Sequence, residues 1–100
     1  MSGIKHDDGK TRYDLLPVDA LEEVAVVLMH GANRYGDRNW EKGISYSRIY
    51  RALLGHIWAW WMKSGPDKDT GRSHLAHAAC CVLFLLAYER RGMEKFDDRP

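Results

Sequence analysis

Two histidines three positions apart, His74 and His77, precede the most apolar stretch of the chain, residues 78–88. On a helix this spacing places both imidazoles on the same side, about one turn apart. Asp67 lies in the segment just before them, and His56 lies on the apolar side of an earlier helical pattern. Because polar groups among apolar helices need partners, these residues indicate a site for a ligand, a metal ion or a phosphate group.

The same residues also have a structural interpretation. His74 and His77 could hydrogen-bond carbonyl groups of the preceding loop, and a lone histidine such as His56 is often an ordinary core residue. The carboxylate of Asp67 favours the ligand interpretation, because imidazole and carboxylate groups are common metal ligands. Both interpretations stay open from the sequence.

A second set of residues has the chemistry of nucleotide recognition. A guanidinium binds phosphate, an aromatic ring stacks on a base, and an amide pairs with a purine edge. These side chains occur close together in the sequence, in Arg34, Tyr35, Asn39 and Trp40. The alternative is that Tyr35 and Trp40 anchor a loop to the core. His30, near the end of the same helical pattern, is included in neither set.

The composition is that of one small globular domain, residues 1–100. The chain is 45% hydrophobic and 29% charged, with a net charge of +1. Such a composition excludes a disordered protein and argues against the basic surface that binds long nucleic acids. Small anionic ligands remain compatible with it.

The only two cysteines, Cys80 and Cys81, are adjacent in the apolar stretch. Neighbours on a helix point about 100° apart, so no disulfide is expected between them. Free cysteines are typical of a reducing compartment, which we therefore expect. No segment resembles a signal peptide, and the apolar stretch is too short to cross a bilayer. We therefore expect a cytoplasmic protein without a membrane partner.

Hydrophobic periodicity predicts an all-α fold, a small bundle of three main helices. The predicted elements are an N-terminal arm, three helices and a C-terminal tail, at about residues 1–16, 18–33, 47–64, 72–91 and 93–100. Asp19 and Glu22 fit a capping box at the start of the first helix, or an acidic pair for a metal ion. Lys10 and Arg12 in the arm could close over phosphates, although solvated charge is the simpler interpretation.

Two of the predicted helices are too apolar for a monomer. Leu54, Trp58 and Trp61 extend the apolar arc of helix 47–64 to roughly half its circumference, against about 100° for an ordinary surface helix. Helix 72–91 is apolar on nearly every side. We expect a homo-oligomer in which these two helices form the interface and complete the bundle, with the tryptophans in the core and the interface.

Three segments carry a resemblance to a known family. They read DGKTRYDL, GANRYGDRNW and DKDTGRSHLAHA, at residues 8–15, 31–40 and 67–78. With them the chain resembles the phage-associated family labelled dATP/dGTP diphosphohydrolase, N-terminal domain. The resemblance implies a small all-α, MazG-like pyrophosphohydrolase, located in the host cytoplasm if phage-encoded. Such an enzyme cleaves a purine (deoxy)nucleoside triphosphate to the monophosphate and pyrophosphate with a divalent metal ion.

The resemblance also implies Mg²⁺ or Mn²⁺ between two acidic pairs, but here two histidines stand where the second pair would be. Imidazole suits Zn, Mn, Fe, Co or Ni better than Mg²⁺. The expected metal ligands are Asp19, Glu22, His74 and His77. The expected catalytic residues are Glu22, Glu23 and Asp67. The expected nucleotide contacts are Lys10, Arg12, Arg34, Tyr35, Asn39, Trp40 and His56.

Two other functions stay open from the sequence. The incomplete acidic set favours a protein that binds and sequesters a nucleotide or a signalling nucleotide without cleaving it. A helical assembly factor, in which the histidines are structural, is the third.

Overall fold

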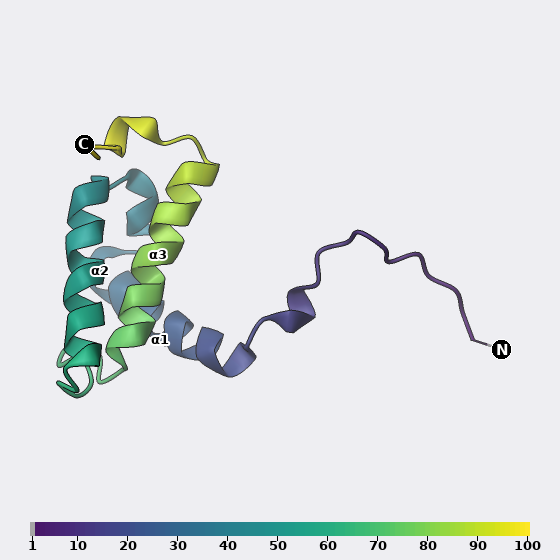
Figure 1. Cartoon of the computed structure of the whole chain (residues 1–100), viewed down its shortest axis with the longest axis horizontal. Helices are drawn as coiled ribbons and strands as arrows, with labels where there is room; N and C mark the ends of the chain where they lie inside the picture. The colour runs from purple at the N-terminus through teal and green to yellow at the C-terminus, as the bar shows by residue number, and fades with distance from the viewer. Residues whose placement is uncertain (1) are drawn as a thin grey trace.

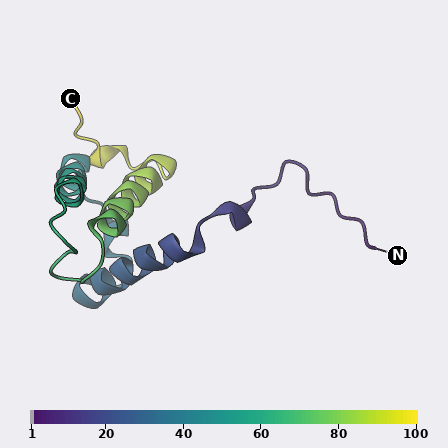
Figure 2. The same cartoon turned by 60° about the horizontal axis from the view of Figure 1, so that its bottom comes forward.

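The computed structural model describes residues 2–100 of the chain, and their fold is all-α. Its helices are α1 (Val18–Tyr35), α2 (Tyr46–Trp61) and α3 (His74–Arg90), with the 3-10 turns η1 (Tyr13–Leu15), η2 (Asn39–Lys42) and η3 (Glu94–Phe96). Over residues 2–100 there is no β-strand. Helices α2 and α3 lie side by side, and α1 passes across the end of α3 where that helix begins (Figures 1 and 2). The predicted fold class is confirmed.

The helix ends follow local backbone chemistry. Helix α1 runs two residues beyond the predicted end because Gly36, at φ 93°, is the residue that leaves the helix, and its N–H donates to the carbonyl of Ala32 at 2.8 Å. Helix α2 stops three residues before the predicted end, where Lys63 turns the chain at φ 55°. Helix α3 begins after Ser73, whose hydroxyl oxygen accepts the N–H of Leu75.

The predicted capping box at the start of α1 is wrong. Pro17 is the N-cap residue and offers no side-chain acceptor, while the carboxylate of Asp19 accepts the N–H of its neighbour Ala20 at 2.9 Å. Helix α2 is capped from a distance instead. The backbone N–H of Ser47 donates to one carboxylate oxygen of Asp98 at 2.8 Å, and its hydroxyl donates to the other. The C-terminal tail is therefore packed onto the bundle.

Helix α3 is the centre of the core, which accounts for part of its apolar circumference, while Leu75, Val82, Leu83 and Leu86 remain exposed. On one side Ala76 and Cys80 pack against Val24 and Val27 of α1. On the other side Cys81 and Tyr88 form a second cluster with two residues of α2, Tyr46 and Ile49. Both cysteines are buried and free, as the sequence predicts.

Tyr88 is fully buried, and its hydroxyl donates to the carbonyl oxygen of Trp40 at 2.6 Å. The ring of Phe96 from the tail reaches the same cluster and lies directly on Gly43, where any Cβ atom would collide with it. Gly43 also has φ 101°, which favours glycine. The turn after α1, helix α3 and the tail are thus joined at one point.

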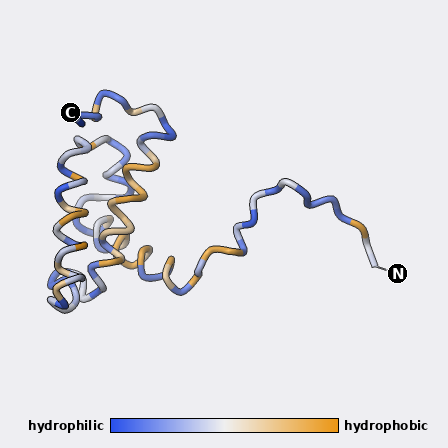
Figure 3. The backbone as a smooth tube through the Cα atoms, viewed as in Figure 1, coloured by the Kyte–Doolittle hydropathy of each residue, from blue (hydrophilic) through white to orange (hydrophobic). Residues whose placement is uncertain are grey.

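Large apolar side chains remain exposed. Trp58 and Trp61 of α2 are 70% and 74% exposed, so the expectation that they belong to the core is wrong for a single chain. The N-terminal arm extends away from the bundle (Figure 1), and its residues Leu15 and Leu16 are exposed. Hydrophobic residues lie along α3 and at the junction of the arm with α1 (Figure 3). Within residues 2–100, none of the helices combines the length and hydropathy of a membrane span.

Replacing Tyr88 with Phe tests the contact at the centre of the core. The variant keeps the ring and removes the hydroxyl that Trp40 accepts, so the free energy of unfolding should fall by about 1–2 kcal/mol. Urea unfolding measures this, and Tyr50→Phe at an exposed position of α2 is the matched control. Equal stability of Tyr88→Phe and the parent chain would show that the hydrogen bond contributes nothing.

The exposed tryptophans generate a second prediction, the homo-oligomer expected from the sequence. Light scattering at micromolar concentration should give a multiple of 11.5 kDa. Trp61→Glu should lower that mass and leave the helix content unchanged, because Trp61 is exposed in one protomer. Lys68→Glu, in the loop between α2 and α3, controls for added negative charge. A parent chain that scatters as 11.5 kDa at these concentrations contradicts the prediction.

Candidate functional site

Three histidines meet where α2 packs against the start of α3. The ring of His56 is stacked on that of His77, with centroids 4.6 Å apart and planes 19° apart. Its Nδ1 lies 2.9 Å from Nδ1 of His74, a hydrogen bond in which one of the two nitrogens carries the proton. The three-residue spacing of His74 and His77 places both rings toward α2, and α2 supplies the third.

Asp67 organises the loop before α3. Its carboxylate accepts the backbone N–H groups of Asp69 and Thr70, at 2.9 and 3.1 Å. The same carboxylate lies 3.5 Å from Nε2 of His77, and the hydroxyl of Thr70 lies 2.7 Å from that nitrogen. Two oxygens therefore surround one ring nitrogen of His77, and their positions are fixed by the turn.

The surroundings favour neutral imidazoles beside an ionised carboxylate. Burial lowers the pKa of His56, and the neighbouring histidines lower it further. Burial also lowers the pKa of His77, although the charge of Asp67 opposes this. For Asp67 burial acts to raise the pKa, but the N–H groups of Thr70 and Asp69 outweigh it, so its pKa is lowered. At neutral pH the cluster thus presents nitrogen and oxygen lone pairs.

Three of these side chains have the spacing of metal ligands. One ligand atom from each of His56, Asp67 and His77 lies within 4.8 Å of the others, and residues 2–100 contain no second group of this kind. The side chains of His77 and Asp67 are 15% and 16% exposed. His74 stands outside the group and contacts it through His56.

The structure does not assemble the ligand set expected from the sequence. Asp19, Glu22 and Glu23 are exposed on the first turns of α1, which project from the bundle (Figure 2). Glu23 forms an ion pair with Arg72 at 3.0 Å, and Asp19 binds a backbone N–H of its own helix. Within one protomer the structure therefore does not bring Asp19 and Glu22 to His74 and His77, because α2 and the Asp67 loop lie closer to the histidines.

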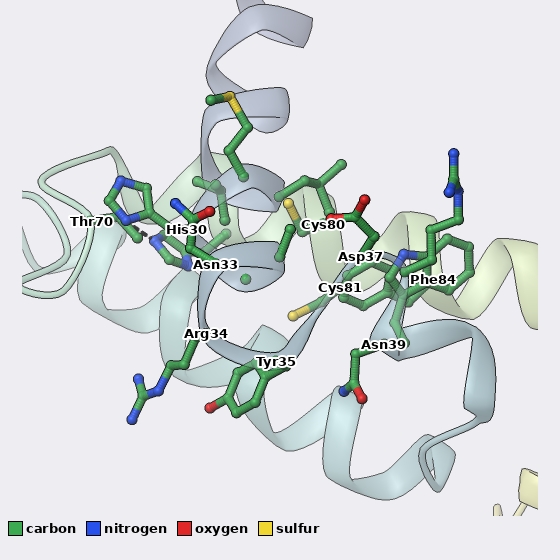
Figure 4. A pocket seen from close by; sticks show the side chains of 18 of the residues that line it. His30, Asn33, Arg34, Tyr35, Asp37, Asn39, Thr70, Cys80, Cys81 and Phe84 are labelled. Atoms are coloured by element: carbon green, nitrogen blue, oxygen red, sulfur yellow. Dashed lines mark hydrogen bonds between the residues drawn. The ribbon is translucent and has the colours of Figure 1, made fainter.

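A pocket of about 1220 Å³ opens beside the cluster, with His56, Thr70 and His77 at one end. Its walls come from the second half of α1, from η2 and from α3 (Figure 4). Cys80 and Phe84 form part of its apolar wall. Its polar lining includes Arg34 and Tyr35 from the last turn of α1 and Asn39 from η2, with Trp40 beside them.

A family model described as dATP/dGTP diphosphohydrolase, N-terminal, matches residues 1–99. The chain belongs to this family. A protein of Salmonella phage PMBT28 named dATP/dGTP diphosphohydrolase is 38% identical over 85 residues, which are 85% of this chain and 29% of that protein. The chain thus spans about three-tenths of the length of that relative. No solved structure matches this chain.

The three segments that carry the family resemblance lie in different parts of the structure. Residues 67–78 build the Asp67 loop and the start of α3, and residues 31–40 line the pocket. Residues 8–15 lie in the arm, where Arg12 pairs with Asp14 at 2.7 Å. Neither Lys10 nor Arg12 lines the pocket.

The side chains of Arg34 and Tyr35 lie at the edge of the pocket, whereas the ring of Trp40 packs against the core. The Arg34 guanidinium lies 5.4 Å from the centroid of the Tyr35 ring, which is 60% exposed. Figure 4 shows both side chains on the same edge of the pocket as Asn39. The ring of Trp40 is stacked on Phe84 at 5.0 Å and also lies under the Arg91 guanidinium, so it anchors η2 to the core.

Sequence reasoning missed three residues of this site. His30 and Asn33 line the pocket, and Thr70 contacts both the Asp67 carboxylate and His77. Helical spacing could have found His30, because residues three and four apart share a helix face and Arg34 follows it by four. Nothing in the spacing of Thr70 marks it, since its position depends on the turn around Asp67.

Proposed function

We propose that this chain binds a purine deoxynucleoside triphosphate in the pocket and hydrolyses it to the monophosphate and pyrophosphate with a divalent metal ion. The observation that carries the proposal is the arrangement of one pocket, which has metal-ligand side chains at one end and phosphate- and base-binding side chains along its edge. The name of the relative from Salmonella phage PMBT28 supports the same substrates.

Each part of the nucleotide has a matching group. The Arg34 guanidinium offers a fork of N–H donors to phosphate oxygens, and among residues 2–100 it has no ion-pair partner. Tyr35 offers an exposed ring to a base. The half-buried amide of Asn39 offers both a donor and an acceptor to a purine edge. Trp40 supports this edge from the core side.

The metal-ligand end of the pocket suits the triphosphate. A divalent ion held there would neutralise phosphate charge and lower the pKa of a bound water. The Thr70 hydroxyl, within hydrogen-bond distance of His77, could orient that water or a phosphate oxygen. Because α3 carries His77 and, about one turn later, Cys80, the metal-ligand end of the pocket and part of its apolar wall belong to one helix.

Binding without cleavage is the second candidate, and one observation favours it. The relative from Salmonella phage PMBT28 matches this chain over 29% of its own length, so other parts of that protein could carry its hydrolysis. The exposed positions of Asp19, Glu22 and Glu23 agree with this candidate, because an acidic pair for Mg²⁺ is not assembled in one protomer.

A nucleotide panel separates the two candidates. The chain is incubated with dATP, dGTP, dCTP or dTTP and with Mg²⁺, Mn²⁺, Co²⁺ or Zn²⁺, and products are resolved by ion-exchange chromatography. We expect dAMP or dGMP with pyrophosphate. Calorimetric binding of purine nucleotides without product would favour the second candidate. The absence of both binding and product would overturn the proposal.

Replacing Arg34 with Ala tests the phosphate contact. The loss of one guanidinium contact should weaken dGTP binding at least tenfold, which corresponds to about 1.4 kcal/mol. Arg51→Ala, an exposed arginine of α2 outside the pocket, is the control and should bind as the parent does. If calorimetry gives equal affinities for both variants, with circular dichroism unchanged, the phosphates bind elsewhere.

A further inference from the structure

We infer that His56, Asp67 and His77 form a three-ligand centre for a transition metal ion of the zinc class, with its open position toward the pocket. The site thereby departs from the Mg²⁺ chemistry that the family resemblance implies. Any part this ion plays in hydrolysis rests on the proposed function. The affinity of the centre for metal is a separate property, and it is measured without nucleotide.

The distances already approach those of a bound ion. Ligand atoms around a tetrahedral zinc ion, with bonds of about 2.0–2.2 Å, lie about 3.3–3.6 Å apart. Nε2 of His77 and the Asp67 carboxylate oxygen are 3.5 Å apart. The nitrogen of His56 completes the set within 4.8 Å, so binding of an ion requires the ligand atoms to move closer together. With three protein ligands, one position stays open for water or a phosphate oxygen.

The hydrogen bonds of the cluster prepare the nitrogens for a cation. When the Thr70 hydroxyl donates to Nε2 of His77, that nitrogen is unprotonated, and a metal ion would replace the hydroxyl proton at its lone pair while the hydroxyl turns to the Asp67 carboxylate 3.5 Å away. An unprotonated Nε2 beside the Asp67 carboxylate, 3.5 Å away, is an arrangement that a cation between the two stabilises.

His74 acts as a positioning residue for His56. Their Nδ1 atoms are 2.9 Å apart, so one of these nitrogens must donate. When His56 donates, its Nε2 carries the lone pair that a metal ion requires. Partners that fix the tautomer of a ligating histidine commonly raise metal affinity about 10–100-fold. This explains why His74 belongs to the cluster without belonging to the ligand set.

The donor set selects the class of metal. Two imidazole nitrogens with one carboxylate suit zinc, cobalt, nickel, iron or manganese, whereas Mg²⁺ prefers oxygen ligands in octahedral geometry. Cysteine does not complete the set, because burial raises the pKa of Cys80 to about 11 and its thiol stands outside the ligand group. The carboxylates that would suit Mg²⁺ are on the exposed first turns of α1.

Metal titration of the 100-residue chain tests the inference. After removal of metal with a chelator, Zn²⁺ binding is measured by competition with a chromophoric chelator, and Co²⁺ binding by the visible absorption of a four-coordinate site. We expect one ion per chain, retained in millimolar Mg²⁺. Zn²⁺ affinity should fall at least about a hundredfold in His77→Ala and Asp67→Ala, and about tenfold in His74→Gln. His6→Ala, in the arm, should leave it unchanged.

Because Asp67 also holds its loop, His77→Gln serves as a second ligand variant with a ring-sized polar side chain, and circular dichroism checks the fold of each. Absence of stoichiometric binding, or affinity unchanged in the folded His77 variants, would overturn the metal centre. Zn²⁺ binding in a chain that hydrolyses no nucleotide supports the centre and counts against the proposed function alone. Nucleotide hydrolysis that continues in the metal-free chain would count against a role of the ion in hydrolysis. It would not count against the metal centre itself.

Discussion

The packing of α2 against α3 is the contact on which the rest of the structure depends. It buries Tyr46 and Ile49 against Cys81 and Tyr88, which supply one half of a small core. The same contact brings His56 against the start of α3, about two turns of α2 beyond Ile49 at 3.6 residues per turn. Fold and site therefore share one interface, and a change that separates these helices removes both.

The sequence predicted the helices well because their signals are local. Periodic apolar residues, Gly36 after α1 and Ser73 before α3 all act within a few residues of the element they define. The failures are long-range contacts. The cap of α2 comes from Asp98, at the far end of the chain, and no spacing rule connects it with Ser47.

The same difference between local signals and long-range contacts applies to the site. That His74 and His77 share a helix face follows from their spacing, and the structure places both against His56. That α2 rather than α1 supplies the side chain next to these histidines depends on which helices pack together at that level. Asp19 and Glu22 have suitable chemistry and spacing but lie on turns that project from the bundle (Figure 2). Residue type alone could not exclude them.

Helix α3 also contacts two chemically different regions of the pocket. Its first turn carries His77, its middle carries the pocket wall at Cys80 and Phe84, and its last turns hold Tyr88, which fixes the carbonyl of Trp40. The contact of Tyr88 ties η2, which carries Asn39 and Trp40, to the same helix as His74 and His77. Helix α3 therefore links the histidine end of the pocket to the turn that follows α1.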